Sequence, residues 1–467
     1  MTRVIHRPVR TNLIDFLFEP VDNSPLVLFR VAFGLLIALE AGGAIATGWV
    51  YRAFVEPDFT FNFIGFDWLQ PLVGETMYIV YATMAILGVM VMLGYRYRFA
   101  VTAYGVLWTI SYLLQKSSYN NHYYLLILLC GLMAIVPAHR YYSLDAKQGF
   151  VARSLTCPRW CLLLFVVQVG IVYFFAALAK VYPGWTAGKP IALWFASKAD
   201  FYLIGPWLQE RWLQQLVVYG GIAFDALVVP LLLWKRTRPY IFVIGIFFHL
   251  FNSAVFHIGI FPYMMIGICV FFFPPEQIRA WFFRRKPDVD PTTLPPYPAN
   301  YWLVGILSLY FLWQLYLPLR HHLYYGDVFW TEEGHRMAWR MMLRTRWGNA
   351  TFKVVDPATE KTWNAHPSDY LTAKQVRKLG SHPDMIWQFS QFLEREYQRQ
   401  GYADVAVYVT GRASLNGSEL MPLTDPTVDL TEVDWQPFRH ADWIVPFPKK
   451  DNGDRNRVGG RPETGDR

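Results

Sequence analysis

Nine apolar segments, each about 15 to 24 residues long, follow one another along the first two thirds of this chain. About 20 apolar residues are enough for a helix to cross the hydrocarbon core of a bilayer. Helices are the expected form there, because every backbone polar group must find its hydrogen bond within the segment. We therefore predict a mainly α-helical polytopic membrane protein with about nine transmembrane helices, at residues 26–47, 72–94, 99–114, 122–136, 160–182, 213–234, 240–258, 259–273 and 301–319.

Composition and charge agree with a membrane location. Hydrophobic residues make up 54% of the chain and charged residues only 17%, against about 25% in soluble globular proteins. The formal charge of +8 lies in the apolar part, which has 23 Lys and Arg against 15 Asp and Glu before Arg320, with 20 against 20 from there on. This placement indicates membrane topology and contact with lipid headgroups, so we expect a lipid bilayer and no nucleic acid as partner.

The positions of the basic residues predict the orientation of the helices. Cytoplasmic loops are enriched in Lys and Arg, so we place the N-terminus in the cytoplasm and everything after the ninth segment outside. The first apolar stretch is long and lacks a small-residue cleavage site, so we expect an insertion signal that is not cleaved. The basic groups precede the first segment and follow each even-numbered one: Arg3, Arg7, Arg10; Arg96, Arg98; Arg140, Lys147, Arg153, Arg159; Lys235, Arg236, Arg238; Arg279, Arg284, Arg285, Lys286.

A shift in composition near Arg320 marks a domain boundary. Beyond it, Ala350–Val355 and Val405–Thr410 are rich in β-branched residues, which favours strands, and Met385–Gln400 has apolar residues at helical spacing. The predicted division is a transmembrane helical domain at 1–320, a small extracytoplasmic α+β domain at 321–448 and a charged, glycine-rich, disordered tail at 449–467.

Segments seven and eight meet at His257–Gly259, with Pro262 just beyond. The pair is either a tight hairpin or one broken, re-entrant helix pair. Non-helical backbone at that depth is tolerated only where protein buries it or water reaches it. Both alternatives predict a cavity at this position.

Three groups of polar residues interrupt the apolar segments. Lys180 ends an almost unbroken apolar run, where a charged side chain costs at least about 2.5 kcal/mol and therefore indicates function. Asn120, Asn121 and His122 open the fourth segment. Residues 249, 253 and 257 share one helical face of the seventh segment, with 252 beside it. The predicted orientation brings the Asn-Asn-His group, Lys180 and His257 together in the outer half of the membrane, in a pocket that opens outward.

Each group also has a structural alternative. Asn120 or Asn121 can cap the following helix. Lys180 can extend to the headgroups from the end of its segment, and His249 can be a hydrogen-bonded core histidine. Asp225 has no obvious partner in the sequence and is predicted to be structural.

The four cysteines indicate neither a disulfide framework nor a metal site. The outer domain has none, and Cys157 and Cys161 lack the further ligands that a closed zinc site requires. We therefore expect no metal.

Five short strings carry a family resemblance: Ser118-Tyr119-Asn120-Asn121-His122; Val172-Tyr173-Phe174 to Lys180 with Trp185; Phe248-His249-Leu250-Phe251-Asn252-Ser253 with Phe256-His257-Ile258-Gly259; Trp339-Arg340-Met341-Met342; and Trp435-Gln436-Pro437-Phe438. In order and spacing, from about Ser24 to Pro446, they resemble those of vitamin K-dependent gamma-glutamyl carboxylases. The closest resemblance is to bacterial members with the same transmembrane domain, which implies a bacterial inner membrane.

The resemblance implies an enzyme that couples two reactions. Reduced vitamin K, a naphthoquinol, would be deprotonated by the active-site lysine and react with O2, becoming an epoxide by way of a strongly basic alkoxide. That alkoxide would remove a γ-proton from glutamate in a peptide or protein substrate, and the carbanion would add CO2. A lysine suits the first step because desolvation can lower its pKa by several units, whereas arginine stays charged. A quinone-epoxide reductase is a candidate partner.

The resemblance also assigns roles to individual residues. Lys180 is the base, and His122 and Asn121 orient or stabilise charged intermediates. The other candidates line the pocket for substrate and quinone: Asn120, His249, Asn252, Ser253, His257, Trp339 and Arg344.

Two departures from the family pattern leave alternatives open. Animal carboxylases continue well past the position that matches Trp443, so propeptide-directed processive carboxylation is not expected here. They also have histidine where Arg344 stands. If that histidine serves carboxylation, this chain would be a quinol epoxidase without glutamate carboxylation; alternatively, Arg344 would bind a substrate carboxylate through two nitrogens. A different class, a membrane transporter or binding protein, would also place polar residues on broken helices.

Overall fold

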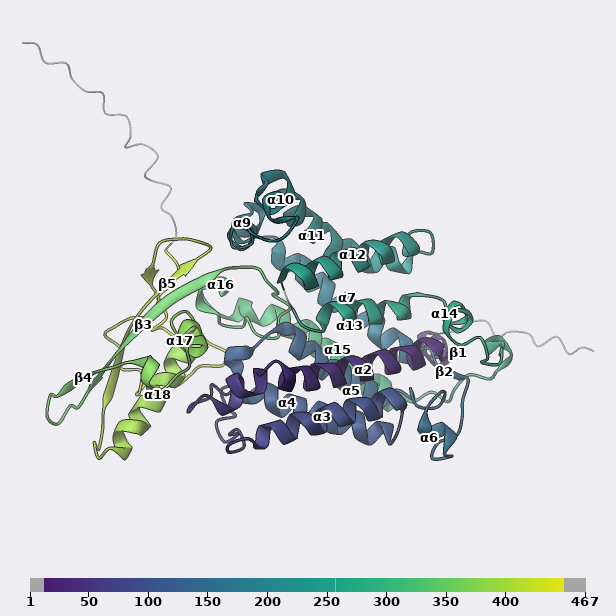
Figure 1. Ribbon diagram of the computed structural model, residues 1–467, viewed down its shortest axis with the longest axis horizontal. Helices are drawn as coiled ribbons and strands as arrows, with labels where there is room; N and C mark the ends of the chain where they lie inside the picture. Colours follow the sequence, from purple (N-terminus) through teal and green to yellow (C-terminus); the bar gives the residue numbers. More distant parts are fainter. Residues whose placement is uncertain (1–11, 257, 449–467) are drawn as a thin grey trace, which may run out of the picture.

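The computed structural model describes residues 12–256 and 258–448, which form a bundle of long helices with a four-stranded sheet at one end (Figure 1). The predicted site residue His257, the predicted disordered tail at 449–467 and the basic residues Arg3, Arg7 and Arg10 lie outside the described residues.

Helices occupy all nine predicted segments, but fewer than nine have the dimensions of a membrane span. Six are long and apolar enough, or seven if the bent pair at residues 261–272 and 275–282 is one span, so the count of nine is not confirmed. The 15 residues of α5 give a helix of about 22 Å, shorter than a hydrocarbon core of roughly 30 Å. The long helices are α2 (Ser24–Ala46), α3 (Thr76–Leu93), α4 (Tyr97–Leu114), α5 (Asn121–Ile135), α7 (Trp160–Lys180), α11 (Arg211–Leu233), α12 (Arg238–Phe256) and α15 (Tyr301–Leu319); the eighth segment is α13 (Phe261–Ile268) with the 3-10 turn η3 (Cys269–Phe272).

The predicted break between segments seven and eight lies between the end of α12 and the start of α13, and a second break, which the sequence reading did not predict, follows the eighth segment. The axis turns by 117° between the α13–η3 segment and α14 (Pro275–Phe282). Phe273, at the bend, is extended, with φ −88° and ψ 152°. The residue before a proline is kept out of the α region, so Pro274 and Pro275 account for the bend.

Prolines also explain three short helices that the sequence reading did not predict. They lie between α7 and α11, and each has a proline in its first turn. Proline is well tolerated there but interrupts a longer helix, so the connection is broken into separate turns. These helices are α8 (Pro183–Thr186), α9 (Lys189–Ala196) and α10 (Gly205–Gln209).

At the end of the bundle away from the sheet, β1 (Pro20–Asp22) pairs with β2 (Thr156–Pro158) in antiparallel register. The remaining short elements of the bundle are α1 (Leu13–Phe18), the π-helix η1 (Tyr51–Val55), η2 (Lys116–Ser118), α6 (Leu144–Lys147), η4 (Pro291–Thr293) and η5 (Arg320–Leu323).

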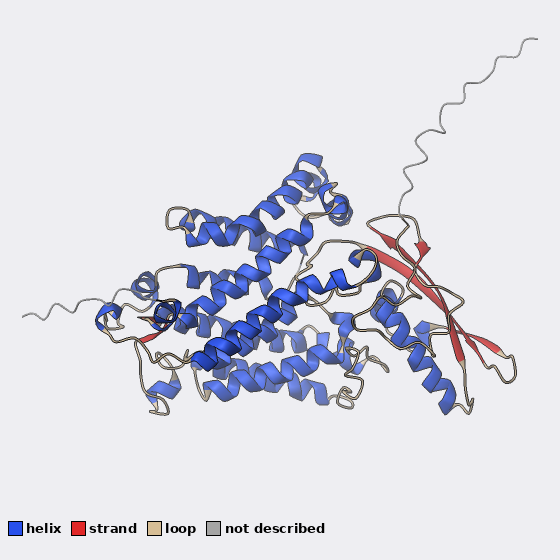
Figure 2. Cartoon of the chain, turned by 180° about the vertical axis from the view of Figure 1, so that it is seen from behind, coloured by secondary structure: helices blue, strands red, loops and turns tan. Residues whose placement is uncertain are grey.

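The region beyond Arg320 is built on an antiparallel sheet of order β4-β3-β5-β6. The predicted strands and helix are confirmed as parts of β3, β5 and α18, although Val405 and Gln400 lie one residue outside β5 and α18. Ile386, Phe389 and Leu393 of α18 are fully buried, and Phe389 packs against Phe352 of β3. Figure 2 shows α17 and α18 between the sheet and the bundle. The elements are α16 (Val328–Thr331), β3 (Arg346–Val355), β4 (Thr362–Ala365), η6 (Pro367–Asp369), α17 (Ala373–Leu379), α18 (Pro383–Arg399), β5 (Ala406–Leu415) and β6 (Met421–Pro422).

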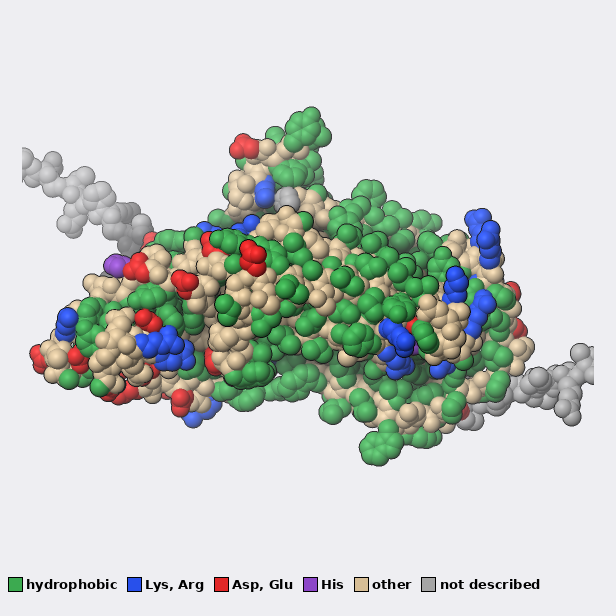
Figure 3. Space-filling view, turned by 60° about the horizontal axis from the view of Figure 1, so that its bottom comes forward, with side chains coloured by type: hydrophobic (Ala, Val, Ile, Leu, Met, Phe, Trp, Pro, Cys, Tyr) green, Lys and Arg blue, Asp and Glu red, His purple; other side chains and the backbone are tan. Residues whose placement is uncertain are grey.

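The surface separates into an apolar middle and charged ends. In Figure 3, hydrophobic side chains cover the middle of the visible face, and Lys and Arg side chains gather at the end away from the sheet. Together with the apolar helices, this distribution is that of an integral membrane protein.

Helices α2 and α3 pack with their backbones in close approach. A Cβ added to Gly88 would lie 2.6 Å from the backbone nitrogen of Ala38, and one added to Gly34 would overlap the backbone of Met92. Small residues at such positions let membrane helices meet over a long contact, where dispersion is the main stabilising term.

We predict that Gly88→Ala destabilises the purified protein by about 1–3 kcal/mol, because the added methyl group overpacks the α2–α3 contact. Gly131→Ala in α5 is the matched control, since a Cβ there meets no atom within 4 Å. Thermal unfolding in detergent should show a lower midpoint for Gly88→Ala and an equal or higher midpoint for Gly131→Ala. Equal midpoints for both variants would contradict the close approach.

Candidate active site

An apolar cavity of about 120 Å³ lies between α7, α11 and α12, with α8 and α9 on its outer side. We call it the aromatic cavity, because six Phe, Tyr and Trp side chains line it. A few polar groups point into it, which is the usual composition of a site for a flat organic ligand. The lining residues include Tyr173, Trp185, Trp194, Phe248, Phe256 and Phe261, with the polar groups His122, Lys180, Asp225, His249 and Asn252.

Lys180, the last residue of α7, forms an ion pair with Asp225 of α11 inside the aromatic cavity. The two side chains are only 12% and 6% exposed, and Lys180 Nζ lies 5.7 Å from the centre of the Trp185 ring. The side chain therefore does not extend to the headgroups, which was its structural alternative. Asp225, for which the sequence offered no partner, has Lys180 as its partner.

The polar face of α12 differs slightly from the predicted one. His249, Asn252 and Phe256 line the aromatic cavity, whereas Ser253 is hydrogen-bonded to Tyr263 at 3.2 Å and lines neither cavity described here. A helix turns by 100° per residue, so spacing alone is equally compatible with a face of 249, 252 and 256 and with a face of 249 and 253. His249 is buried, and its Nε2 is hydrogen-bonded to the Tyr173 hydroxyl at 2.8 Å, as its structural alternative required.

A second cavity, of about 680 Å³, lies where the bundle meets the sheet region. We call it the cationic cavity, because eight Lys and Arg residues line it against one acidic residue, Glu332. The start of α5, the loop between α16 and β3, and the α17–α18 segment supply its walls. The eight cations are Lys116, Arg336, Arg340, Arg344, Arg346, Lys374, Arg377 and Lys378.

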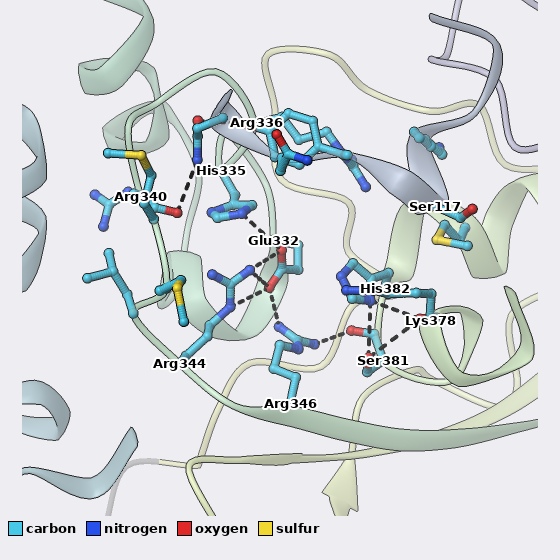
Figure 4. A pocket seen from close by; sticks show the side chains of 18 of the residues that line it. Ser117, Glu332, His335, Arg336, Arg340, Arg344, Arg346, Lys378, Ser381 and His382 are labelled. Atoms are coloured by element: carbon cyan, nitrogen blue, oxygen red, sulfur yellow. Dashed lines mark hydrogen bonds and ion pairs between the residues drawn. The ribbon is translucent and has the colours of Figure 1, made fainter. Parts of the chain in front are cut away.

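Two buried carboxylates compensate half of these cations. Glu332 accepts hydrogen bonds from Arg344 through both its oxygens, and from Arg346 at 2.9 Å (Figure 4). Asp384 pairs with Lys116 and Arg336, each at 2.6 Å. Within residues 12–256 and 258–448, no carboxylate forms an ion pair with the other four, which are Arg340, Lys374, Arg377 and Lys378.

The charge states follow from this pairing. Burial acts to raise the pKa of Glu332, but the charges of Arg344 and Arg346 outweigh it and hold that pKa well below its ordinary value. Burial likewise lowers the pKa of His382 to about 3, so its imidazole is neutral. The cavity is therefore strongly positive at neutral pH, which suits an anionic ligand.

The loop between α16 and β3 has an unusual backbone. Glu332, Met337, Trp339 and Met342 all have positive φ, between 47° and 63°, although none is glycine. Such conformations cost about 1–3 kcal/mol each and are characteristic of functional sites. Trp339 lines neither cavity; it is 1% exposed and packs against Tyr124, which anchors the loop on the bundle.

The predicted Asn-Asn-His group lies at the start of α5, beside this loop. Asn120 caps the helix by accepting a hydrogen bond from the Tyr123 backbone N–H at 2.8 Å, which was its structural alternative. Asn121 donates to the Arg340 carbonyl at 3.2 Å and accepts from the Tyr119 hydroxyl at 2.8 Å. Both asparagines therefore hold backbone or neighbouring side chains while lining the cationic cavity.

One wall separates the two cavities. His122, Met341 and Met342 line both of them. The His122 ring stacks on Phe261 with 3.9 Å between centroids, so it faces the aromatic cavity from α5. The structure thus brings His122, Lys180, His249 and Asn252 to one cavity, and Asn120, Asn121 and Arg344 to the adjoining one.

Sequence reasoning missed most of the cationic cavity. Asn120, Asn121 and His122 were predicted, but of the eight cations only Arg344 was singled out as a site residue, although Arg336, Arg340 and Arg344 recur every four residues and Lys374, Arg377 and Lys378 lie close together in the sequence. This clustering was the available signal. The balance of 20 positive and 20 negative residues after Arg320 concealed it.

The fold and the paired cavities define a class: a polytopic membrane protein with an α+β region that covers a polar site at one end of the helical bundle. Residues 18–277 match the HTTM domain family, and residues 299–450 match the lumenal domain of vitamin K-dependent gamma-carboxylase. The chain belongs to the vitamin K-dependent gamma-carboxylase family. No solved structure gave a significant match.

Family membership implies reduced vitamin K as cosubstrate and a glutamate-containing substrate in a membrane setting. The aromatic cavity fits the cosubstrate, since a naphthoquinol is a flat ring system with hydroxyl groups that need polar partners. The cationic cavity fits a substrate carboxylate.

We predict that Asp384→Asn lowers the stability of the protein by about 3–5 kcal/mol, because Lys116 and Arg336 would remain as buried cations without a counter-charge. Limited proteolysis of the sheet region and the thermal midpoint measure the loss. Asp404→Asn, at an exposed side chain of the same region, is the control and should leave both unchanged.

Acidification should reproduce the effect of Asp384→Asn. Burial opposes ionisation, but Arg336 and Lys116 hold the pKa of Asp384 below its ordinary value. In the unfolded protein an aspartate has a pKa of about 4, and in the folded protein the pKa of Asp384 is lower. The ion pairs therefore stabilise the fold fully above about pH 4, and this stabilisation is lost as the pH falls through the pKa of the folded protein. A wild-type protein that loses no more stability on acidification than Asp384→Asn would contradict this assignment.

Proposed function

We propose that this protein oxygenates a reduced naphthoquinone in the aromatic cavity and uses the reaction to carboxylate glutamate in the cationic cavity. The observation that carries the proposal is the wall shared by the two cavities, formed by His122, Met341 and Met342. A proton can be transferred only between groups in contact, so two coupled reactions require adjoining sites of this kind.

Lys180 is the proposed base in the aromatic cavity. Its amine is held at the end of α7 beside Trp185, where the hydroxyl of a bound quinol would meet it. The quinol, when bound, supplies the driving force through its reaction with O2, which generates a base strong enough to remove a γ-proton from glutamate. The cavity walls exclude water, which would otherwise consume that base.

His122 and Asn121 have different proposed roles. His122 faces both cavities and is placed to stabilise charge that develops at their boundary. The amide of Asn121 is already engaged with the Arg340 carbonyl and the Tyr119 hydroxyl, so its role is to hold the loop that forms the wall. His249 and Asn252 shape the aromatic cavity from α12.

The glutamate side chain would bind the cations that lack a carboxylate partner. Arg340 and Lys378 line the cationic cavity and are accessible to a ligand. Arg344 is engaged with Glu332 through two nitrogens, so its contact with a substrate carboxylate would require Glu332 to move. This engagement favours Arg344 as part of the scaffold. It also gives a specific reason to test the second candidate function, quinol epoxidation without glutamate carboxylation.

The proposed orientation places the sheet region on the extracytoplasmic side and the N-terminus in the cytoplasm of a bacterial inner membrane. It is supported by the Lys and Arg side chains at the end away from the sheet (Figure 3) and by the match to a lumenal domain. A quinone-epoxide reductase in the same membrane would regenerate the cosubstrate.

We expect purified protein supplied with a reduced naphthoquinone, O2, labelled bicarbonate and short glutamate peptides to release epoxide and to incorporate label into the peptide. Lys180→Ala should abolish both products while leaving membrane insertion intact. Epoxide without label would establish the epoxidase alternative. Neither product, with solute uptake into proteoliposomes, would favour a transporter.

We expect Arg340→Gln and Lys378→Gln each to raise the KM for the glutamate peptide by about ten-fold, since a contact to a charged group contributes about 1.5 kcal/mol or more. The KM for the quinol should stay the same, because these residues do not line the aromatic cavity. Arg399→Gln is the control, at a side chain 74% exposed on α18. Unchanged peptide KM in both variants would place the substrate elsewhere.

A further inference from the structure

Asp225 is the one carboxylate that lines the aromatic cavity among residues 12–256 and 258–448. It projects from the middle of α11, where its immediate neighbours Phe224 and Ala226 are apolar. Its carboxylate contacts the Lys180 amine, and the residues are 45 positions apart in the chain. The other titratable groups that line this cavity are His122 of α5, Tyr173 of α7 and His249 of α12.

A carboxylate at this position is not explained by packing. Replacing a buried ion pair with apolar residues of similar volume is often neutral or stabilising, so stability alone does not account for the pair. From α11 the cavity is otherwise lined by Val217 and Gly221, so a leucine at position 225 would continue an apolar face. The position therefore points to the chemistry of Lys180.

We infer that Asp225 is a positioning residue for Lys180, holding its amine toward the ligand and supplying the counter-charge for the ammonium group that forms there. This inference rests on the proposed function of Lys180.

The proton balance of the step explains the need for that charge. The step starts from the pair with one proton fewer than an ion pair, a neutral Lys180 amine beside the Asp225 carboxylate. When that amine takes the proton of a bound hydroxyl, the O–H bond breaks, its electron pair stays on the oxygen and an N–H bond forms. The amine becomes an ammonium ion in a cavity with few polar groups, where an isolated charge is costly. Asp225 is already in contact with Nζ, so the new charge is compensated without rearrangement of the protein.

The geometry gives Asp225 a second effect. Lysine has a flexible four-carbon stem, and its amine donates in three directions. The contact with Asp225 uses one of them, and the Lys180 stem passes Gly221, one turn earlier on α11, at 4.0 Å from a Cβ built there. Helix α11 thus leaves room for the stem at Gly221 and holds the head of the side chain at Asp225.

The test compares Asp225→Asn and Asp225→Glu in the full-length protein in detergent. Asparagine keeps the size and a hydrogen bond but removes the charge, so kcat for quinol epoxidation should fall by about ten-fold or more, as for other carboxylates that stabilise a cation formed during catalysis. KM for the quinol should change little, and Asp225→Glu should restore part of kcat. Asp145→Asn, at a buried carboxylate that caps α4, is the control and should leave kcat unchanged.

A double-variant comparison separates a role through Lys180 from a structural one. The residual rates of Lys180→Ala and of Lys180→Ala with Asp225→Asn should be equal, because Asp225 then has nothing to act on. An equal fractional loss of activity from Asp225→Asn in both backgrounds, or an unchanged kcat in the single variant, would overturn the inference.

A readout independent of catalysis distinguishes failure of this inference from failure of the proposed function. Acylating reagents modify only the unprotonated amine, so at fixed pH the labelling of Lys180 relative to the exposed Lys189, measured by mass spectrometry, should rise in Asp225→Asn. Unchanged relative labelling would refute the action of Asp225 on the Lys180 amine, whether or not the protein makes epoxide. Altered labelling in a protein without epoxidase activity would support that action and refute the proposed function.

Discussion

A buried group of charges holds the sheet region against the helical bundle. Asp384 stands at the start of α18, Lys116 in the outer turn η2 of the bundle, and Arg336 in the loop between α16 and β3; none of the three side chains is more than 16% exposed. In a medium of low polarity each cation requires its carboxylate, so the three segments are bound to one another. The cationic cavity exists because this contact fixes the distance between the bundle and the sheet region.

In the proposed function the two cavities receive two kinds of ligand. The aromatic cavity has a single ion pair within apolar walls, and the cationic cavity has eight basic residues around one acidic residue. A carboxylate is costly to bury among aromatic rings without a partner. Under the proposed function, the separation therefore directs the substrate carboxylate to the cationic cavity and the naphthoquinol to the aromatic cavity.

The sequence predicts the parts of this structure that are governed by local rules. Long apolar runs located every long helix, and Lys180, His249 and Asn252 were recognised because polar groups are unfavourable in such runs. The pairing of Lys180 with Asp225 could not be predicted, because the rotation of α7 relative to α11 is set by packing. The same limit applies to α12, where Phe256 rather than Ser253 lines the cavity. The cations of the cationic cavity, apart from Arg344, were not predicted, because they come from separate segments whose overall charge is balanced.

The shared wall has a mechanical property that follows from its composition. Two of its three residues, Met341 and Met342, are unbranched and have three rotatable side-chain bonds each, unlike the rings around them. They belong to a loop and not to a membrane helix. A change of methionine rotamer is therefore enough to make the shared wall thinner or thicker, so a passage between the two cavities does not require the helices of the bundle to move apart.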